Sequence, residues 1–140
     1  MRLIILAIVL SIFTFSCTPT EKEEYHLVDK MTSFQYYSHK LWLSGEARNS
    51  ELIDFYLHEM EEVAEELIEK KVQYDGYDIG NLTEKMLLPA IERLEESNDS
   101  INFSKNYQLL IKACNSCHIA TDHSYIEISI PKNNPYNQKF

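Results

Sequence analysis

The sequence predicts an all-α protein, an up-down-up-down four-helix bundle with an irregular C-terminal tail. Apolar residues recur at spacings of three and four through four successive segments of the 140-residue chain. Short turn-forming stretches separate these segments, which favours antiparallel packing of consecutive helices. No segment before residue 124 alternates in the way that a strand does.

The first expected helix starts after a short polar segment and ends near Gly45. An apolar stripe with the a/d spacing of a packed helix runs through Leu27, Met31, Phe34, Ser38 and Leu41. Gly45 is the expected C-cap because glycine readily adopts the left-handed conformation found there.

The second expected helix begins at Asn49 or Ser50, both good N-cap residues, and runs to about Lys71. Its inward face consists of Leu52, Tyr56, Met60, Val63 and Leu67, with Ile53 and Phe55 alongside. The opposite face is acidic, and we interpret it as a solvated surface. The turn-rich stretch Y-D-G-Y-D-I-G-N follows.

The third expected helix covers residues 82–97, with a kink where Pro89 removes a backbone donor. Its inward residues are Met86, Leu87, Ala90, Ile91 and Leu94. The fourth runs from about Phe103 to His118. The segment S-Y-I-E-I-S-I-P then alternates and N-N-P-Y-N-Q-K-F is irregular, so we expect the tail to lie as a strap across one end of the bundle.

The N-terminus has the pattern of an export signal. Arg2 precedes an apolar run over residues 3–15, which is shorter than the about 20 residues of a membrane-spanning helix. Ser16 and Cys17 at its end suggest a bacterial lipoprotein signal, with Cys17 acylated; the alternative is an ordinary signal peptide. We therefore expect a signal peptide over 1–16, a lipidated tether over 17–24, the bundle over 25–122 and the tail over 123–140. The mature protein would be exported and tethered to a membrane, facing the periplasm or the cell exterior.

The net charge limits the partners. The whole chain carries −9, and removal of residues 1–16 leaves 124 residues with 12 basic and 22 acidic side chains, or −10. Such a balance argues against nucleic acid, whose phosphates require a basic surface. It is compatible with a redox partner that has a basic docking surface, because complementary charge accelerates association. Simple solubility is the alternative explanation.

The motif C-N-S-C-H at residues 114–118 is the most specific feature of the chain. Cys114 and Cys117 have the spacing for thioether bonds to two haem vinyl groups, and His118 is placed to bind the iron. Structural zinc would need a second pair of ligands, which the sequence lacks if Cys17 is lipidated. A redox dithiol usually begins a helix, whereas this pair lies well inside one. A structural disulfide remains open as a further alternative.

The segments H-K-L-W-L-S-G-E-A-R-N-S-E-L, A-C-N-S-C-H and N-Q-K-F resemble a family of small periplasmic monohaem c-type cytochromes. The position of the motif near the end of a four-helix chain also resembles the cytochromes c-prime and their b-type relatives. The resemblance covers most of residues 25–140, and only the haem motif is highly specific. It implies one covalently attached haem c and an exported location.

The sixth iron ligand separates an electron carrier from a gas-binding protein. In the expected bundle the start of the first helix lies beside the end of the fourth, which places Met31 on the distal side of the iron. The b-type relatives take a methionine from the same helix, so the resemblance also points to Met31. Packing in the core is the alternative role for this side chain. His39 is the runner-up, although it lies eight residues, or about 12 Å, further along the helix.

These residues lead to two functional hypotheses. The first is periplasmic electron transfer by a His/Met-ligated haem, in a protein that is a carrier and not an enzyme. The second is gas binding or sensing at an open or weakly occupied sixth position, with Leu27 and Phe34 lining the distal side. No Arg/His pair with the spacing of a peroxidase is recognisable. A homodimer formed through the first helices is a further possibility.

Overall fold

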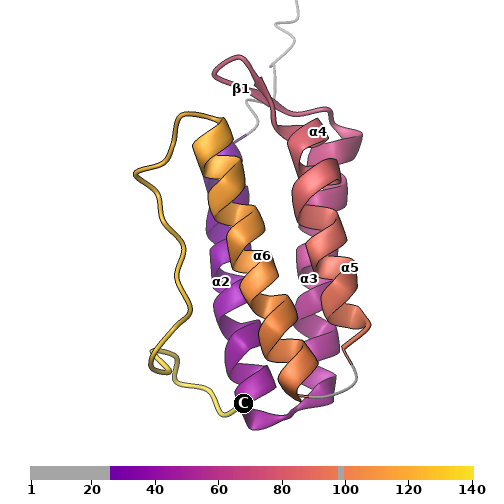
Figure 1. Cartoon of the computed structure of the whole chain (residues 1–140), viewed down its shortest axis with the longest axis vertical. Helices are drawn as coiled ribbons and strands as arrows, with labels where there is room; N and C mark the ends of the chain where they lie inside the picture. Colours follow the sequence, from indigo (N-terminus) through magenta and orange to yellow (C-terminus); the bar gives the residue numbers. More distant parts are fainter. Residues whose placement is uncertain (1–25, 98–99) are drawn as a thin grey trace, which may run out of the picture.

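The computed structural model describes residues 26–97 and 100–140, and these residues are mostly helical (Figure 1). The expected all-α class is confirmed, with one very small antiparallel sheet added to it. The elements are α2 Leu27–Ala47, α3 Ser50–Glu69, β1 Gln73–Tyr74, β2 Tyr77–Asp78, α4 Ile79–Leu82, the π-helical segment η1 Thr83–Leu87, α5 Leu88–Glu95 and α6 Ser100–Ala120. The signal peptide and the acylated Cys17 expected from the sequence lie outside the described residues. In the described part of the chain, no helix combines the length and the apolar character needed to cross a membrane.

Helix α2 continues past Gly45, so the expected C-cap there is wrong. The helix ends at Ala47, and Arg48 takes the left-handed conformation with φ 55°. Gly45 serves another purpose, because a Cβ at this position would collide with the ring of Phe103 on α6. The glycine therefore lets α2 and α6 approach each other closely.

Helix α3 begins where the sequence predicts. Asn49 is its N-cap, and Asn49 Oδ1 accepts a hydrogen bond from the backbone N–H of Leu52 at 3.2 Å. Leu57 and Ala64 join the buried face with Tyr56, Met60 and Leu67, whereas Phe55 is half exposed.

A two-stranded hairpin was not expected from the sequence. Strands β1 and β2 pair Gln73 with Asp78 and Tyr74 with Tyr77. The two residues between them, Asp75 and Gly76, both have positive φ, 48° and 85°. An Asp-Gly pair in this conformation is the favoured two-residue connection of a hairpin. Strands of two residues are too short to produce an alternating pattern.

The third helical segment starts at Ile79, three residues earlier than expected, and is not uniformly α-helical. Its turn over η1 is π-helical, and Pro89 follows in the first turn of α5. Pro89 has no N–H and its ring would clash with the carbonyl four residues before it, and a wider turn relieves such a conflict. The irregularity shifts the register, so Met86 is only half-buried while Leu87 is buried.

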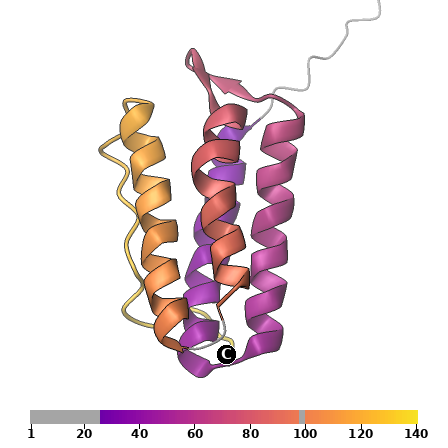
Figure 2. The ribbon, with the colours of Figure 1, turned by 45° about the vertical axis from the view of Figure 1, so that its right-hand side comes forward.

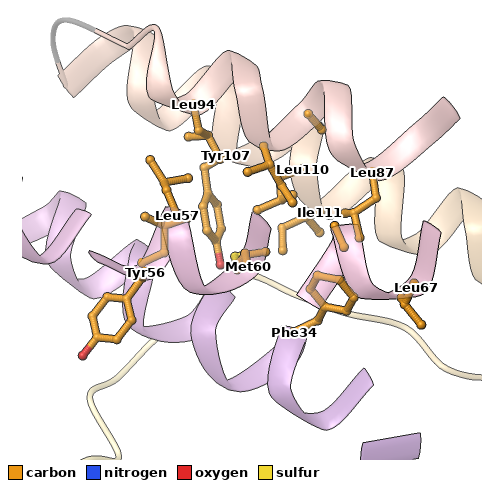
Figure 3. Packing of buried hydrophobic residues seen from close by; sticks show 14 of the residues in the cluster. Phe34, Tyr56, Leu57, Met60, Leu67, Leu87, Leu94, Tyr107, Leu110 and Ile111 are labelled. Atoms are coloured by element: carbon orange, nitrogen blue, oxygen red, sulfur yellow. The ribbon is translucent and has the colours of Figure 1, made fainter. Parts of the chain in front are cut away.

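The core fills the space between the long helices, which lie side by side in both ribbon views (Figures 1 and 2). Figure 3 shows Tyr107 and Met60 among the side chains that point into this space. Both are fully buried, and the same holds for Leu41, Leu67, Ile91 and Leu110. Trp42 packs against the core, with its ring 4.9 Å from that of Tyr107.

The tail, residues 121–140, contains no helix or strand. Instead of lying across one end, as expected, it runs back beside α6 along the length of the helices (Figures 1 and 2). Contacts at both ends fix this course. The side chain of Asn115 is hydrogen-bonded to the backbone of Ile128, and the side chain of Gln138 is hydrogen-bonded to Lys40 and Tyr56.

Candidate functional site

A cavity of about 380 Å³ lies between the first half of α2, the end of α6 and the start of the tail. Its volume falls within the roughly 300–1,000 Å³ typical of ligand pockets. The residues that line it include Leu27, Met31, Phe34, Gln35, Ile79, Thr83, Leu87, Cys114, Cys117, His118, His123, Tyr125, Ile126 and Ile128. Most of these are apolar, as in most small-molecule and cofactor sites.

Three of these residues belong to the five-residue motif C-N-S-C-H on the last turns of α6. Cys114, Cys117 and His118 all line the cavity. Residues three and four positions apart lie on the same face of a helix, so the helix itself directs the two sulfurs and the imidazole to one side. Both cysteines are free thiols, and a disulfide between them is not formed.

Burial makes these thiols poor candidates for redox exchange. It raises the pKa of Cys114 to about 12, with a smaller contribution from the neighbouring Cys117. Burial also raises the pKa of Cys117. Thiol–disulfide exchange proceeds through the thiolate, and redox-active pairs usually have lowered pKa values near a helix N-terminus. This pair instead lies near the C-terminal end of α6.

His118 has one ring nitrogen engaged by the tail. Its Nδ1 lies 2.9 Å from the carbonyl oxygen of Ile126. Because a carbonyl can only accept, this hydrogen bond requires the proton on Nδ1 and leaves the lone pair on Nε2. Histidines that bind metals commonly have this arrangement, since the bond fixes the tautomer and the orientation of the ring.

The opposite wall of the cavity comes from α2. Met31 is half-buried and lines the cavity together with Leu27, Phe34 and Gln35. Met31 and the motif therefore face the same space, although 83 positions separate Met31 from Cys114 in the sequence. Met60 lies in the core instead.

His39, the less favoured candidate for the sixth iron ligand, is not among the residues that line the cavity. It is half-buried elsewhere on α2, and burial lowers its pKa. Trp42 also lies away from the cavity, on the Phe103 and Tyr107 rings. The structure thus brings Met31 to the motif and leaves His39 outside.

Several residues of the cavity wall were not predicted. Thr83 and Leu87 come from the π-helical segment, and their position depends on the widened turn. His123 and Ile126 come from the tail, and the alternation in S-Y-I-E-I-S-I-P, which begins at Ser124, was a signal for Ile126 alone. Across residues 26–97 and 100–140, no group of three or more His, Cys, Asp or Glu side chains is arranged to hold a metal ion.

Comparison with models of known families, with curated proteins and with solved structures finds no match to this chain.

Proposed function

We propose that this protein is a monohaem c-type cytochrome, with haem c attached through Cys114 and Cys117 and bound at the iron by His118. The observation that carries the proposal is that these three side chains line one largely apolar cavity. The hydrogen bond from His118 Nδ1 to Ile126 adds support, because it leaves Nε2 for the iron. The residues present therefore fit the group, and they also fit the resemblance to small periplasmic cytochromes.

We further propose that the helices form an up-down-up-down four-helix bundle. Consecutive helical segments are in contact, α2 with α3, α3 with α5 and α5 with α6, and α2 also contacts α6. The connections between them are short, as in bundles of this type.

Met31 is the proposed sixth ligand, and electron transfer is the proposed role. When bound, haem c would accept one electron from a reduced partner and donate it to an oxidised partner. Ligation by a thioether together with a histidine would raise the reduction potential, which suits a carrier more than a catalyst. The position of Met31 on the cavity wall supports this assignment.

The cellular context is likewise a proposal. The apolar N-terminal segment and Cys17 favour export and a lipid anchor, with the protein facing the periplasm or the cell exterior. The net negative charge favours a redox partner with a basic surface and disfavours nucleic acid. A homodimer remains compatible with these features.

A gas-binding or sensing protein is the second candidate. Leu27 and Phe34 are buried, apolar and next to Met31 on the cavity wall. If Met31 packs in the core and does not bind the iron, a distal side made of such residues would leave room at the iron for a small diatomic ligand.

Absorption spectra of the purified protein test the proposal and separate the two candidates. Pigment that resists acid extraction is expected, because thioether bonds hold the haem. The ferrous protein should be low-spin and should resist carbon monoxide, whereas Met31→Ala should be high-spin and bind it. Met86→Ala is the matched control, since Met86 is half-buried and does not line the cavity.

Each contrary result removes a defined part of the proposal. Pigment that is fully extracted by acid would overturn covalent haem. A ferrous protein that is high-spin and binds carbon monoxide without any substitution would replace the electron carrier by the gas-binding protein. If Met86→Ala and not Met31→Ala changed the spin state, the assignment of Met31 would be wrong.

A further inference from the structure

The side chain of Asn115 holds the tail beside α6. Its Nδ2 donates to the carbonyl oxygen of Ile128 at 2.9 Å, and its Oδ1 accepts from the N–H of Ile128 at 2.8 Å. A carboxamide carries one donor face and one acceptor face, like a peptide group. Asn115 therefore satisfies both backbone groups of Ile128, as a neighbouring strand would, although the tail belongs to no sheet.

The same piece of tail provides the hydrogen-bond partner of His118. The carbonyl of Ile126, two residues before Ile128, lies 2.9 Å from His118 Nδ1. Both carbonyls bond to side chains of α6, and only Glu127 separates the two residues that carry them. One bonded residue thus sets the direction of the other.

The spacing on α6 matches this arrangement. Asn115 and His118 are three positions apart and lie on one face of the helix. As the position on α6 advances from 115 to 118, the bonded position in the tail falls from 128 to 126. The tail therefore runs antiparallel to the end of α6, in agreement with its course in Figures 1 and 2.

Local bonds at the start of the tail do not replace this clamp. The N–H of Ile126 donates to the carbonyl of His123 at 2.9 Å, and the N–H of His123 donates to the carbonyl of His118 at 2.7 Å. These bonds turn the chain back at the end of α6. Beyond Ile126, Asn115 and Ile128 exchange two hydrogen bonds that tie this part of the tail to the end of α6.

We propose that Asn115 is a positioning residue for the iron ligand: by clamping Ile128, it fixes the carbonyl of Ile126 as the acceptor for His118 Nδ1. This inference rests on the proposed function, because its consequence is felt at the iron. A firm hydrogen bond from Nδ1 makes Nε2 more basic and strengthens its bond to a metal. One of the two residues between the cysteines thereby acquires a role that the C-x-x-C-H pattern alone does not assign.

Two measurements on the haem-loaded protein test the inference. Hydrogen exchange at the Ile128 amide reports the clamp itself. The iron–histidine stretching frequency of the ferrous protein, obtained by resonance Raman spectroscopy, reports the strength of the His118–iron bond. The Raman measurement is made in a Met31→Ala background, so that the iron is five-coordinate in every sample.

Asn115→Ala should accelerate exchange at Ile128 by about tenfold or more, the factor that corresponds to losing about 1.4 kcal/mol of local protection. It should also lower the stretching frequency. Asn115→Asp is isosteric and keeps the acceptor for the Ile128 N–H, but it places an oxygen instead of a donor against the Ile128 carbonyl, so changes in the same direction are expected. It serves as the readout if the alanine variant fails to retain haem. Ser116→Ala, the other residue between the cysteines, is the control and should change neither quantity.

Faster exchange at Ile128 with an unchanged stretching frequency would overturn the positioning role, because the clamp would be broken without effect on His118. Unchanged exchange would overturn the clamp. A chain that carries no covalent haem before any substitution would instead overturn the proposed function. The two failures are distinguishable, because the role of Asn115 is measured only on protein that carries haem.

Discussion

The hydroxyl of Tyr107 on α6 donates a hydrogen bond to the backbone carbonyl of Ser38 on α2, with 2.9 Å between the oxygens. Tyr107 is fully buried, and its ring packs against Phe103 and Trp42. The bond joins the two helices at the cavity itself, because Ser38 lines it together with Met31 and the two cysteines. It is a direct link between the elements that form opposite walls of the candidate site.

Tyr107→Phe should reduce the free energy of unfolding by about 1–2 kcal/mol, because a buried hydrogen bond is lost while the ring is kept. Chemical denaturation followed by circular dichroism measures the change. Tyr125→Phe is the control, since Tyr125 is 78% exposed and should change stability by less than about 0.5 kcal/mol. Equal effects of the two substitutions would contradict the importance of the buried bond.

Tyr107 also predicts a loss of stability at alkaline pH. Burial raises the pKa of Tyr107 above the ordinary value of about 10. The unfolded chain therefore loses this proton near pH 10 while the folded protein retains it. The contribution of the protonated Tyr107 hydroxyl to the free energy of unfolding is fully present below pH 10. It declines as the pH rises towards the pKa of Tyr107 in the folded protein. Denaturation at several pH values above 9 should show that the free energy of unfolding declines less steeply with pH for Tyr107→Phe than for the unsubstituted chain. Identical slopes would contradict a raised pKa of Tyr107.

Gly45→Ala should destabilise the protein through the contact between α2 and α6. A Cβ at position 45 would lie 2.6 Å from Cδ1 of Phe103 and closer still to two other ring carbons. Overpacking of this kind costs about 1–3 kcal/mol, which outweighs the helix propensity gained. Thermal unfolding measures the effect. Glu46→Ala, an exposed neighbour on the same helix, is the control. A Gly45→Ala variant as stable as the original would mean that Phe103 moves aside easily.

Lys40 should hold the far end of the tail. Its ammonium donates to Gln138 Oε1 at 2.6 Å and lies 4.5 Å and 5.1 Å from the ring centroids of Tyr36 and Tyr136. Lys40→Met keeps most of the apolar stem and removes the charge. Desolvated cation–π contacts are worth about 2 kcal/mol, so amide exchange at Tyr136 should accelerate by roughly tenfold or more.

The control for this prediction is Lys139→Met, because Lys139 is an exposed lysine in the same part of the chain. It should leave exchange at Tyr136 unchanged. If Lys40→Met also left it unchanged, the tail would be held by Gln138, Tyr56 and the packing of Phe140 instead.

Single substitution of either cysteine tests the attachment chemistry. Cys114→Ser and Cys117→Ser should each retain haem through one thioether bond, with a shifted absorption band of the pyridine complex because one vinyl group is left unsaturated. The double variant should release its haem on acid extraction. Haem that resists acid extraction in the double variant would contradict attachment through these residues.

The helices were predictable because their signals are local. The period of the apolar residues follows from 3.6 residues per turn, and Asn49 caps α3 through its own neighbours. The features that were missed depend on partners distant in the sequence. Gly45 looks like a helix end until Phe103 is placed against it. The hairpin at Asp75 and Gly76 is too short to show a period, and the π-helical turn before Pro89 changes the register.

The helical class and the group of two thiols and an imidazole on one helical face were predictable from the residues alone, because three- and four-residue spacings have the same meaning in any helix. The packing of the helices was needed to show that Met31 and not His39 shares a cavity with that group, since this depends on how far α2 is displaced along α6. The tertiary structure also decided the course of the tail. Alternation suggests an extended chain but does not name its partner, and here the partner is the side chain of Asn115.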